Sequence, residues 1–382
     1  MSELRWNKLV GQERVKGVIG SAFRNGTLGH AYLFCGERGT GKFAAAVDLA
    51  MALLCKGGGA RPCGECLSCK KVLGYSHPDF HVIMPLVLSE EHTKKEDNHI
   101  VLTDEGWKFA ADMTLKRLND PYKLPQYAGI PNIPVDWIRE ANYAILRGAT
   151  EGAANVAIID GVDTMRKEAA NAMLKTLEEP PPGTVMILLT DKINSVLPTI
   201  VSRCQIMRFA LLPPDAVCAE LHKRFVGEAT DGQYDAKIRA AAASGSLGIA
   251  VEEYEDSLDP YYEAAVGLWN DCLRNDWEAA ARNAEELSGG ADALSSCRKT
   301  LKCLVQLLRF AFLQKFGAAG NNINLGQSYM IELPDAAASN DVERFAALCQ
   351  SALHAIDARG NVMMAMVNFV CSLMETLNGE KQ

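Results

Sequence analysis

Residues 30–54 combine a short apolar run, a glycine-rich loop and a helical pattern, and this order constrains the fold more than any other feature. The run His30–Cys35 predicts a buried strand, and the stretch from Lys42 to about Leu54 predicts a helix. Between them, Gly36–Lys42 fits G-x-x-x-x-G-K, a loop whose backbone amides surround phosphate oxygens while the lysine neutralises their charge. We therefore expect a phosphate loop, with a turn that only packs strand on helix as the alternative. The candidate phosphate-contacting residues are Gly36, Gly39, Thr40, Gly41 and Lys42.

Two residues that hydrolysis would need are missing. The position after the loop lysine should carry a Ser or Thr hydroxyl that ligates Mg²⁺, and here it is Phe43. Asp160 ends the second predicted strand, where a carboxylate would hold the ion, although a turn or N-cap role is the alternative. The next residue would activate the attacking water, and it is Gly161; we expect Asp163 to point elsewhere. The sequence predicts a degenerate nucleotide site with impaired Mg²⁺-dependent hydrolysis and leaves nucleotide binding at Lys42 open.

Four cysteines at short spacing give the sharpest chemical signal. Cys55, Cys63, Cys66 and Cys69 read C-x7-C-x2-C-x2-C. Four thiolates suit tetrahedral Zn²⁺ and leave no open position for water, so a structural zinc is expected, with free thiols on a loop as the alternative. His77 is nearby but is expected to be a surface or capping residue.

Strands alternate with helices in the first part of the chain. The second and third predicted strands are Asn155–Asp160 and Thr184–Thr190, and the helical pattern between them stops at Pro180. This alternation predicts a parallel α/β sheet. Residues 85–134 fit least well, and we expect a long, partly mobile surface insertion with a helical piece around Glu105–Leu118.

The chain changes character after Pro214 and carries only helical periodicities. One helical face is formed by Leu301, Leu304, Val305, Leu308 and Phe312, and another by Val362, Ala365, Met366, Phe369, Val370 and Leu373. The methionine-rich face is expected to be buried core, with a groove for a partner as the alternative.

Composition excludes some classes of protein. The net charge of −8 gives no whole-chain attraction to nucleic acid, so DNA contact would need a local basic face or partners that supply the charge. No export signal and no apolar run of membrane-spanning length are visible. We therefore expect reduced thiols, no membrane partner and a cytoplasmic location.

Several stretches together resemble the bacterial DNA polymerase III clamp-loader subunits of the AAA+ family. The matching stretches are the loop region His30–Lys42, the four-cysteine module, Ser76–Phe80, Ala170–Thr184 and Leu197–Gln205. The γ/τ kind is similar in the loop, cysteines and S-R-C, but carries Ser or Thr at the position of Phe43 and an Asp-Glu pair where this chain has Asp160-Gly161. The δ′ kind is similar in Ser76–Phe80 and has degraded nucleotide motifs, so the resemblance is to δ′.

The resemblance implies an architecture and an assembly. It implies a RecA-like AAA+ domain at 1–210, with the zinc module at 55–69 and the insertion at 85–134, then an all-α lid at 211–255 and an all-α collar at 256–382. It implies a ring with δ and γ/τ subunits that loads the sliding clamp onto primer–template DNA, within the DNA polymerase III holoenzyme.

The resemblance also implies roles for single residues. Arg203 in Ser202-Arg203-Cys204 would act in trans as an arginine finger on the ATP of a neighbouring γ/τ subunit, and Thr190 falls at the sensor-1 position. Gly248 falls where active members carry a sensor-2 arginine. An ATPase of its own is not expected. The alternatives are an active γ/τ-type ATPase and a DNA-binding zinc module on a vestigial fold, against which the acidic charge balance argues.

Overall fold

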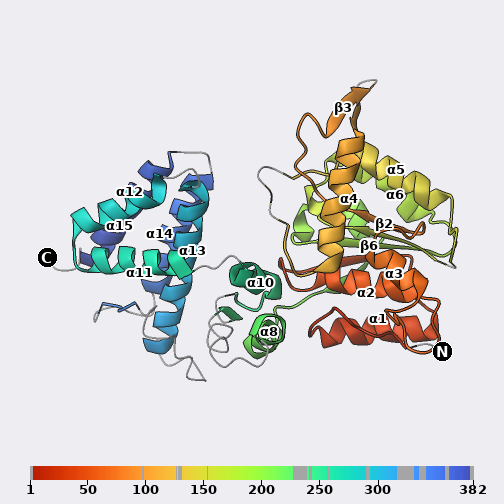
Figure 1. Cartoon of the computed structure of the whole chain (residues 1–382), viewed down its shortest axis with the longest axis horizontal. Coiled ribbons are helices and arrows are strands. Elements are labelled where there is room, and N and C mark those ends of the chain that lie inside the picture. The colour runs from red at the N-terminus through yellow and green to blue at the C-terminus, as the bar shows by residue number, and fades with distance from the viewer. Residues whose placement is uncertain are drawn as a thin grey trace. The chain divides into compact units, whose positions relative to one another are not determined.

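The computed structural model describes residues 3–96, 99–125, 127, 131–152, 154–226, 239–240, 243–255, 259–289, 293–315, 331–334, 341–357 and 361–378. The chain divides into two compact units, residues 1–224 with 243–252, and residues 225–242 with 253–382 (Figure 1). The described part contains no helix long and apolar enough to cross a bilayer. None of the twelve cysteines forms a disulfide.

A five-stranded parallel sheet forms the centre of the first unit. Its order is β2 (Phe80–Ile83), β5 (Asn155–Ile159), β6 (Thr184–Thr190), β1 (Ala31–Cys35) and β7 (Gln205–Arg208). The three strands expected from the sequence are therefore confirmed, and β2 and β7 are the two that it did not reveal. β1, β5 and β6 are buried along their whole length, as strands covered by helices on both faces must be.

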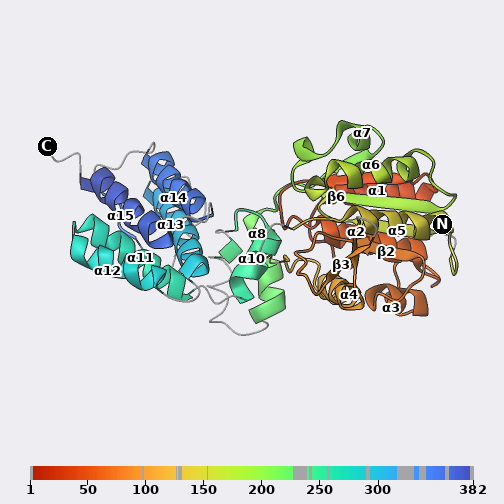
Figure 2. The same ribbon diagram turned by 90° about the horizontal axis from the view of Figure 1, so that it is seen from above.

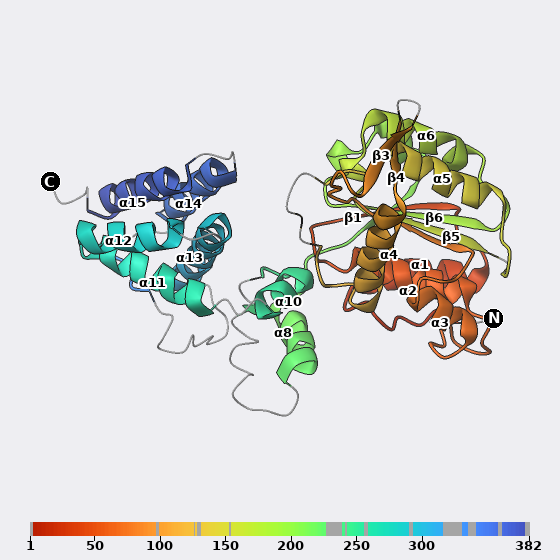
Figure 3. The ribbon, with the colours of Figure 1, turned by 45° about the horizontal axis from the view of Figure 1, so that its top comes forward.

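Helices cover both faces of this sheet (Figure 3). On one face lie α1 (Glu13–Asn25), α2 (Lys42–Leu54) and α3 (Leu67–Leu73); on the other lie α5 (Val135–Leu146), α6 (Lys167–Glu178) and α7 (Pro198–Val201). Successive β1 residues serve opposite cores, because Tyr32 and Phe34 join the α2 side while Ala31 and Leu33 join the α5 side. The sheet and its two helical layers confirm the expected parallel α/β class.

Short helices follow the strands of the sheet. The 3-10 segments Val162–Thr164 and Ile193–Ser195 follow β5 and β6. Helix α8 (Pro214–Leu221), the π-helical turn His222–Val226 and α10 (Leu247–Glu255) follow β7. Within the predicted lid at 211–255, residues 227–238 and 241–242 lie outside the described residues.

The insertion at 85–134 is not merely a surface feature. It contains a hairpin of β3 (Thr93–Glu96) and β4 (His99–Leu102) and the helix α4 (Asp104–Asn119), which confirms the expected helical piece. However, α4 buries Ala110 in one core and Leu118 in the other, and the following Tyr122 is only 1% exposed. The expectation of a surface segment is wrong because these apolar side chains remove their area from water by joining the domain core.

The described part of the second unit is helical and has its own core. Its helices are α11 (Asp259–Leu273), α12 (Trp277–Ser288), α13 (Ala293–Lys315), α14 (Asp341–Asp357) and α15 (Val362–Asn378). Helix α11 packs on α12 and α13, and α14 packs on α13 and α15 (Figure 2). Met366 and Phe369 are buried among Leu304 and Leu308 of α13, so the methionine-rich face is core, as expected.

Asp48 ties the N-terminal segment to α2 and should make stability depend on pH. Its Oδ2 accepts the N–H groups of Lys8 (2.8 Å) and Leu9 (3.0 Å), yet burial raises the pKa of Asp48 from 3.8 to about 6. The folded state therefore holds this proton more tightly than the unfolded state. The associated stability is present below pH 4 and is lost as the pH rises through 6.

We expect the wild-type chain to lose about 2 kcal/mol of unfolding free energy relative to Asp48→Asn between pH 4 and pH 7. The asparagine Oδ1 can accept the same two N–H groups and does not ionise. Urea unfolding of both proteins across this pH range measures the difference. Parallel curves would show that folding does not shift the pKa of Asp48.

Candidate functional site

The carboxyl ends of three adjacent strands meet at one edge of the sheet and define the candidate site. β1 runs into the loop Gly36–Gly41, β5 into Asp160, and β6 ends in Thr190 and leads to Asp191. Parallel sheets bind ligands at this edge because the loops that follow the strands converge there. A cavity of about 250 Å³ opens beside the loop. Its lining includes Lys42, Phe43, Arg117, Asp160, Asp163 and Asp191.

The loop has the form of a phosphate cradle, but its lysine is already engaged. Gly41 begins α2 with φ 99°, and no side chain caps the helix N-terminus. Lys42 Nζ donates to the carbonyl oxygens of Gly36 and Glu37, both at 2.7 Å, and lies 2.7 Å from Asp191 Oδ1. Thr40 is buried, and its hydroxyl donates to Glu37 O at 2.8 Å. The ammonium group is thus neutralised within the chain, by an aspartate that follows directly after β6.

The carboxylate at the end of β5 faces a cation from the insertion. Asp160 Oδ2 lies 3.8 Å from Arg117 Nη2, and the Arg117 guanidinium sits 4.7 Å from the centre of the Phe43 ring. Burial raises the pKa of Asp160, whereas the positive charges of Arg117 and Lys42 oppose that rise. Burial also lowers the pKa of Arg117. Asp160 caps no helix, since Gly161 is the N-cap of the following 3-10 turn.

Asp163 lies in the cavity, so the expectation that it points elsewhere is wrong. The 3-10 turn Val162–Thr164 folds it back toward β6, where its Oδ1 accepts the Thr190 hydroxyl at 2.7 Å. Thr190 is buried, and its oxygen in turn accepts the N–H of Lys192 at 3.0 Å. Thr190 and Asp163 therefore form a connected polar pair at the carboxyl end of the sheet.

Gly161 leaves no room for the missing acidic side chain. Its φ is 66°, in the left-handed region, and a Cβ atom there would lie 2.6 Å from Pro85 Cγ. We expect Gly161→Glu to lose about 2–5 kcal/mol of unfolding free energy, because left-handed backbone costs about 1–2 kcal/mol and overpacking about 1–3 kcal/mol. Gly148→Glu is the matched control, since Gly148 has φ 77° and open space around its Cβ position.

Chemical denaturation of the two variants separates the backbone cost from the clash. Gly148→Glu should lose only the backbone part, and Gly161→Glu should gain no ATP turnover. Equal losses in both variants would show that Pro85 yields without cost and that the site can accept an acidic residue.

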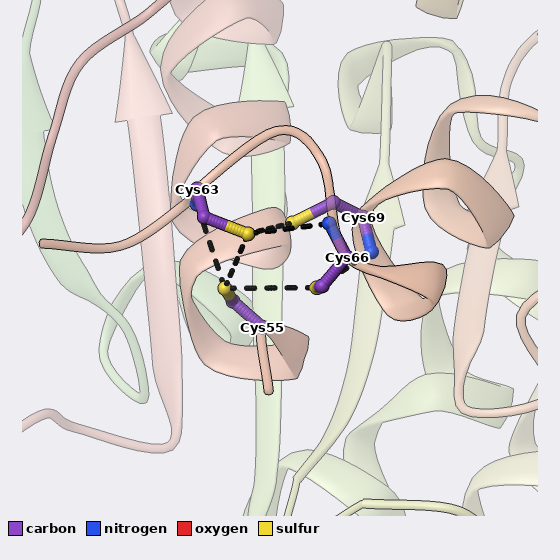
Figure 4. A group of neighbouring side chains, drawn as sticks. All are labelled: Cys55, Cys63, Cys66 and Cys69. Carbon is purple, nitrogen blue, oxygen red and sulfur yellow. Dashed lines mark hydrogen bonds between the residues drawn. The ribbon is translucent and has the colours of Figure 1, made fainter. Parts of the chain in front are cut away.

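The cysteine module forms a second candidate site (Figure 4). Cys55 follows the end of α2, Cys66 caps α3, Cys69 lies in the first turn of α3, and Cys63 comes from the loop between these helices. Their four sulfur atoms lie within 4.8 Å of one another. The contacts are 3.5 Å for Cys55–Cys63, and 3.9 Å for both Cys55–Cys66 and Cys63–Cys69. A tetrahedron of sulfurs at about 2.3 Å from Zn²⁺ has edges of about 3.8 Å, so the donor set fits a closed four-thiolate site.

Backbone amides favour thiolates at this cluster. The N–H groups of Gly57 and Cys63 point to the Cys55 sulfur, that of Cys66 to Cys63, and that of Cys69 to Cys66. Burial opposes ionisation of Cys66, yet the N–H groups of Cys69 and Lys56 and the neighbouring Cys63 and Cys69 thiols lower its pKa to about 6, whereas burial raises the pKa of Cys69. Thiolates are the metal-binding form of cysteine. His77 is not a ligand: it is buried rather than on the surface, and its Nδ1 accepts the N–H of Asp79 at 3.2 Å.

Arg203 lies away from the chain's own phosphate loop. It follows α7, and its guanidinium pairs with Glu178 Oε1 at 2.6 Å and donates to Thr199 O at 2.8 Å. About a third of its side chain is exposed. Gly248 does lie beside the loop, where its N–H donates to Gly39 O at 3.0 Å.

Together, the strand order and the residues at its carboxyl edge define an α/β protein with a phosphate loop and a four-cysteine module. Residues 11–213 match the family model described as DNA polymerase III, delta subunit, and the chain belongs to that family.

Its similarity to individual proteins supports the delta′ kind. It is 31% identical over 206 residues to the DNA polymerase III subunit delta′ of Bacillus subtilis, covering 54% of this chain and 50% of that one. It is 32% identical over 176 residues to the delta′ subunit of Pseudomonas aeruginosa, covering 46% and 41%. It is 28% identical over 256 residues to the Bacillus subtilis subunit tau, covering 66% and 38%. The chain thus spans about half the length, or less, of these relatives.

Proposed function

We propose that this chain is the delta′ subunit of a DNA polymerase III clamp loader, and that it serves as an AAA+ subunit without ATP hydrolysis of its own. Two replaced catalytic positions support the proposed absence of hydrolysis. Phe43 removes the hydroxyl that would ligate Mg²⁺, and Gly161 has no space for the carboxylate that would activate water. The strand order and the family membership support the clamp-loader assignment.

In the assembled complex, we propose that the chain contributes Arg203 to catalysis in trans. An arginine finger stabilises the charge that develops on the transferred phosphoryl group in a neighbouring subunit's site. Arg203 is partly exposed and reaches no part of the described cavity beside the chain's own loop, which supports a target on another subunit. The neighbour would be a γ/τ subunit, and δ and the sliding clamp would be further partners. Primed DNA would be bound through the complex, since this chain is acidic.

For the cysteine module we propose a structural zinc ion held by Cys55, Cys63, Cys66 and Cys69. When bound, the metal would supply crosslinking of two helices and no catalysis, because four thiolates fill a tetrahedral shell. The residues themselves connect the end of α2 to the start of α3. The module would therefore fix the position of the C-terminal end of α2, the helix whose N-terminus follows the phosphate loop.

The proposal is tested by measuring ATP turnover of the isolated chain and of the complex reconstituted with γ/τ and δ from the same organism. We expect no turnover above background from the chain alone, and clamp loading on primed DNA only when the chain is included. Robust turnover by the chain alone would instead place it among the active γ/τ-type ATPases. Full clamp loading without the chain would refute the clamp-loader role.

A further inference from the structure

The segment that follows α4 lies directly against the phosphate loop. The Tyr122 hydroxyl oxygen lies 2.7 Å from the position that a Cβ atom would take on Gly41, and it accepts the N–H of Val10 at 3.0 Å. Tyr122 is 1% exposed and Leu124 is 5% exposed. A Cβ on Gly248, at the start of α10, would lie 3.0 Å from both Leu124 Cδ2 and Tyr122 O. Residues 122–124 therefore fill the space between the loop and the start of α10.

This segment is held in place by contacts on its outer side. The Arg224 guanidinium lies 5.1 Å from the centre of the Tyr122 ring and bonds to Asp120 Oδ1 at 3.0 Å and to Glu220 Oε1 at 2.9 Å. Tyr122 N–H donates to Asp120 Oδ1 at 3.0 Å, and Lys8 Nζ donates to Leu118 O at 3.3 Å. The buried ring and this charged network therefore hold residues 120–124 in one position.

Arg117 contacts both the carboxylate at the end of β5 and the aromatic ring that follows the loop lysine. Nine-tenths of its side chain is buried, and it lies between the Phe43 ring and Asp160 Oδ2. Its Nη1 donates to Lys123 O at 2.7 Å, while its buried Nε has no hydrogen-bond partner. Phe43 takes the place of the metal-ligating hydroxyl, and the guanidinium stacked on it takes the place of a cation beside the carboxylate.

We propose that the segment Arg117–Leu124 is an internal occupant of the nucleotide site and keeps the phosphate loop closed to ATP and ADP. This inference deepens the proposed function, and it rests on the proposal that the subunit does not hydrolyse ATP. The space left beside the loop is about 250 Å³, which is below the about 300–1,000 Å³ of pockets that hold drug-sized ligands. The Lys42 ammonium group contacts Gly36 O, Glu37 O and Asp191 Oδ1. These contacts would have to break before Lys42 could bind a polyphosphate.

Closure of this kind lowers affinity without removing the loop itself. If the open form is about 1% of the population, the apparent affinity for nucleotide falls about a hundredfold. The loop amides at the N-terminus of α2 keep the geometry that binds anions. Clearing the segment should therefore uncover a latent nucleotide site.

Calorimetric titration with ADP and with ATPγS, with and without Mg²⁺, tests this inference on the full chain. The cleared variant is Arg117→Ala/Tyr122→Ala/Leu124→Ala. The matched control is Asp112→Ala/Lys116→Ala, an exposed ion pair on the same helix. We expect no saturable binding up to about 1 mM for the wild type and the control, and at least about a hundredfold tighter binding by the cleared variant.

Two results would overturn the inference. One is wild-type binding as tight as that of the cleared variant, and the other is a folded cleared variant that still binds neither nucleotide. If circular dichroism shows that the triple variant does not fold, Arg117→Ala/Leu124→Ala is titrated under the same criteria, since it keeps the buried Tyr122 ring. These outcomes concern binding by the chain alone, whereas failure of the proposed function would appear as turnover or as clamp loading without the chain.

Discussion

Cys63→Ser is expected to abolish zinc binding and to cost the protein at least about 4 kcal/mol of unfolding free energy. Structural zinc supplies about 10–16 kcal/mol of binding free energy in small zinc domains, and loss of one thiolate forfeits a large part of it. For a domain of this size, each kcal/mol lowers the melting temperature by about 2–4 °C, so a fall of about 8–16 °C is expected. Cys63 is suited to this test because it is only partly buried, so a serine there leaves no large cavity.

The measurements are zinc content per chain by atomic spectroscopy and thermal unfolding by circular dichroism. Cys371→Ser, a partly buried cysteine of α15, is the matched control and should keep both values. A chelator added to the wild type should reproduce the melting temperature of Cys63→Ser. Wild-type protein without bound zinc that melts together with the variant would contradict the prediction and leave the four residues as free thiols.

The parts of the fold that the sequence revealed are those with local signals. The strand, glycine loop and helix of residues 31–54 are contiguous, and their order alone predicts how they pack. The strands β5 and β6 are unbroken apolar runs, because both of their faces are covered. In the same way, the close spacing of Cys63, Cys66 and Cys69 already predicts that these three residues lie near one another.

The strands that the sequence did not reveal lie at the edges of the sheet. β7 is the four residues Gln205–Arg208, mostly exposed, and β2 is the four residues Phe80–Ile83 with a histidine inside. An edge strand has one open side and one neighbour, so polar residues interrupt its apolar pattern. Periodicity therefore could not distinguish these segments from turns.

The missed site residues depend on contacts between distant parts of the chain. Arg117 reaches Asp160, and Tyr122 reaches Val10; no local pattern encodes such pairs. A signal is nevertheless present, since Leu118, Tyr122 and Leu124 are large apolar residues inside a segment whose composition predicts a surface position. Burying such side chains is favourable by about 1.5–3 kcal/mol each, so their presence favours a covered position.

Arg203→Ala is expected to remove nearly all ATP turnover at the one site it would serve in the complex. Arginine fingers contribute about 10³–10⁵-fold to phosphoryl transfer. A ring with several ATP sites would lose only the share of the site next to this subunit, so the sharpest assay uses a complex whose other γ/τ sites are inactivated. Arg203→Lys should recover only part of the rate, because an ammonium keeps the charge but lacks the planar fork.

The ion pair with Glu178 gives this prediction an internal control. Arg203 is held to Glu178 at 2.6 Å in the isolated chain, and catalysis in trans requires its guanidinium to face a γ-phosphate instead. Glu178→Ala should therefore leave turnover intact or raise it, while Arg24→Ala, on the exposed end of α1, should leave it unchanged. Each variant must melt like the wild type and assemble with the same stoichiometry. In a complex whose other γ/τ sites are inactivated, turnover by Arg203→Ala within twofold of its Arg203 counterpart would exclude the finger.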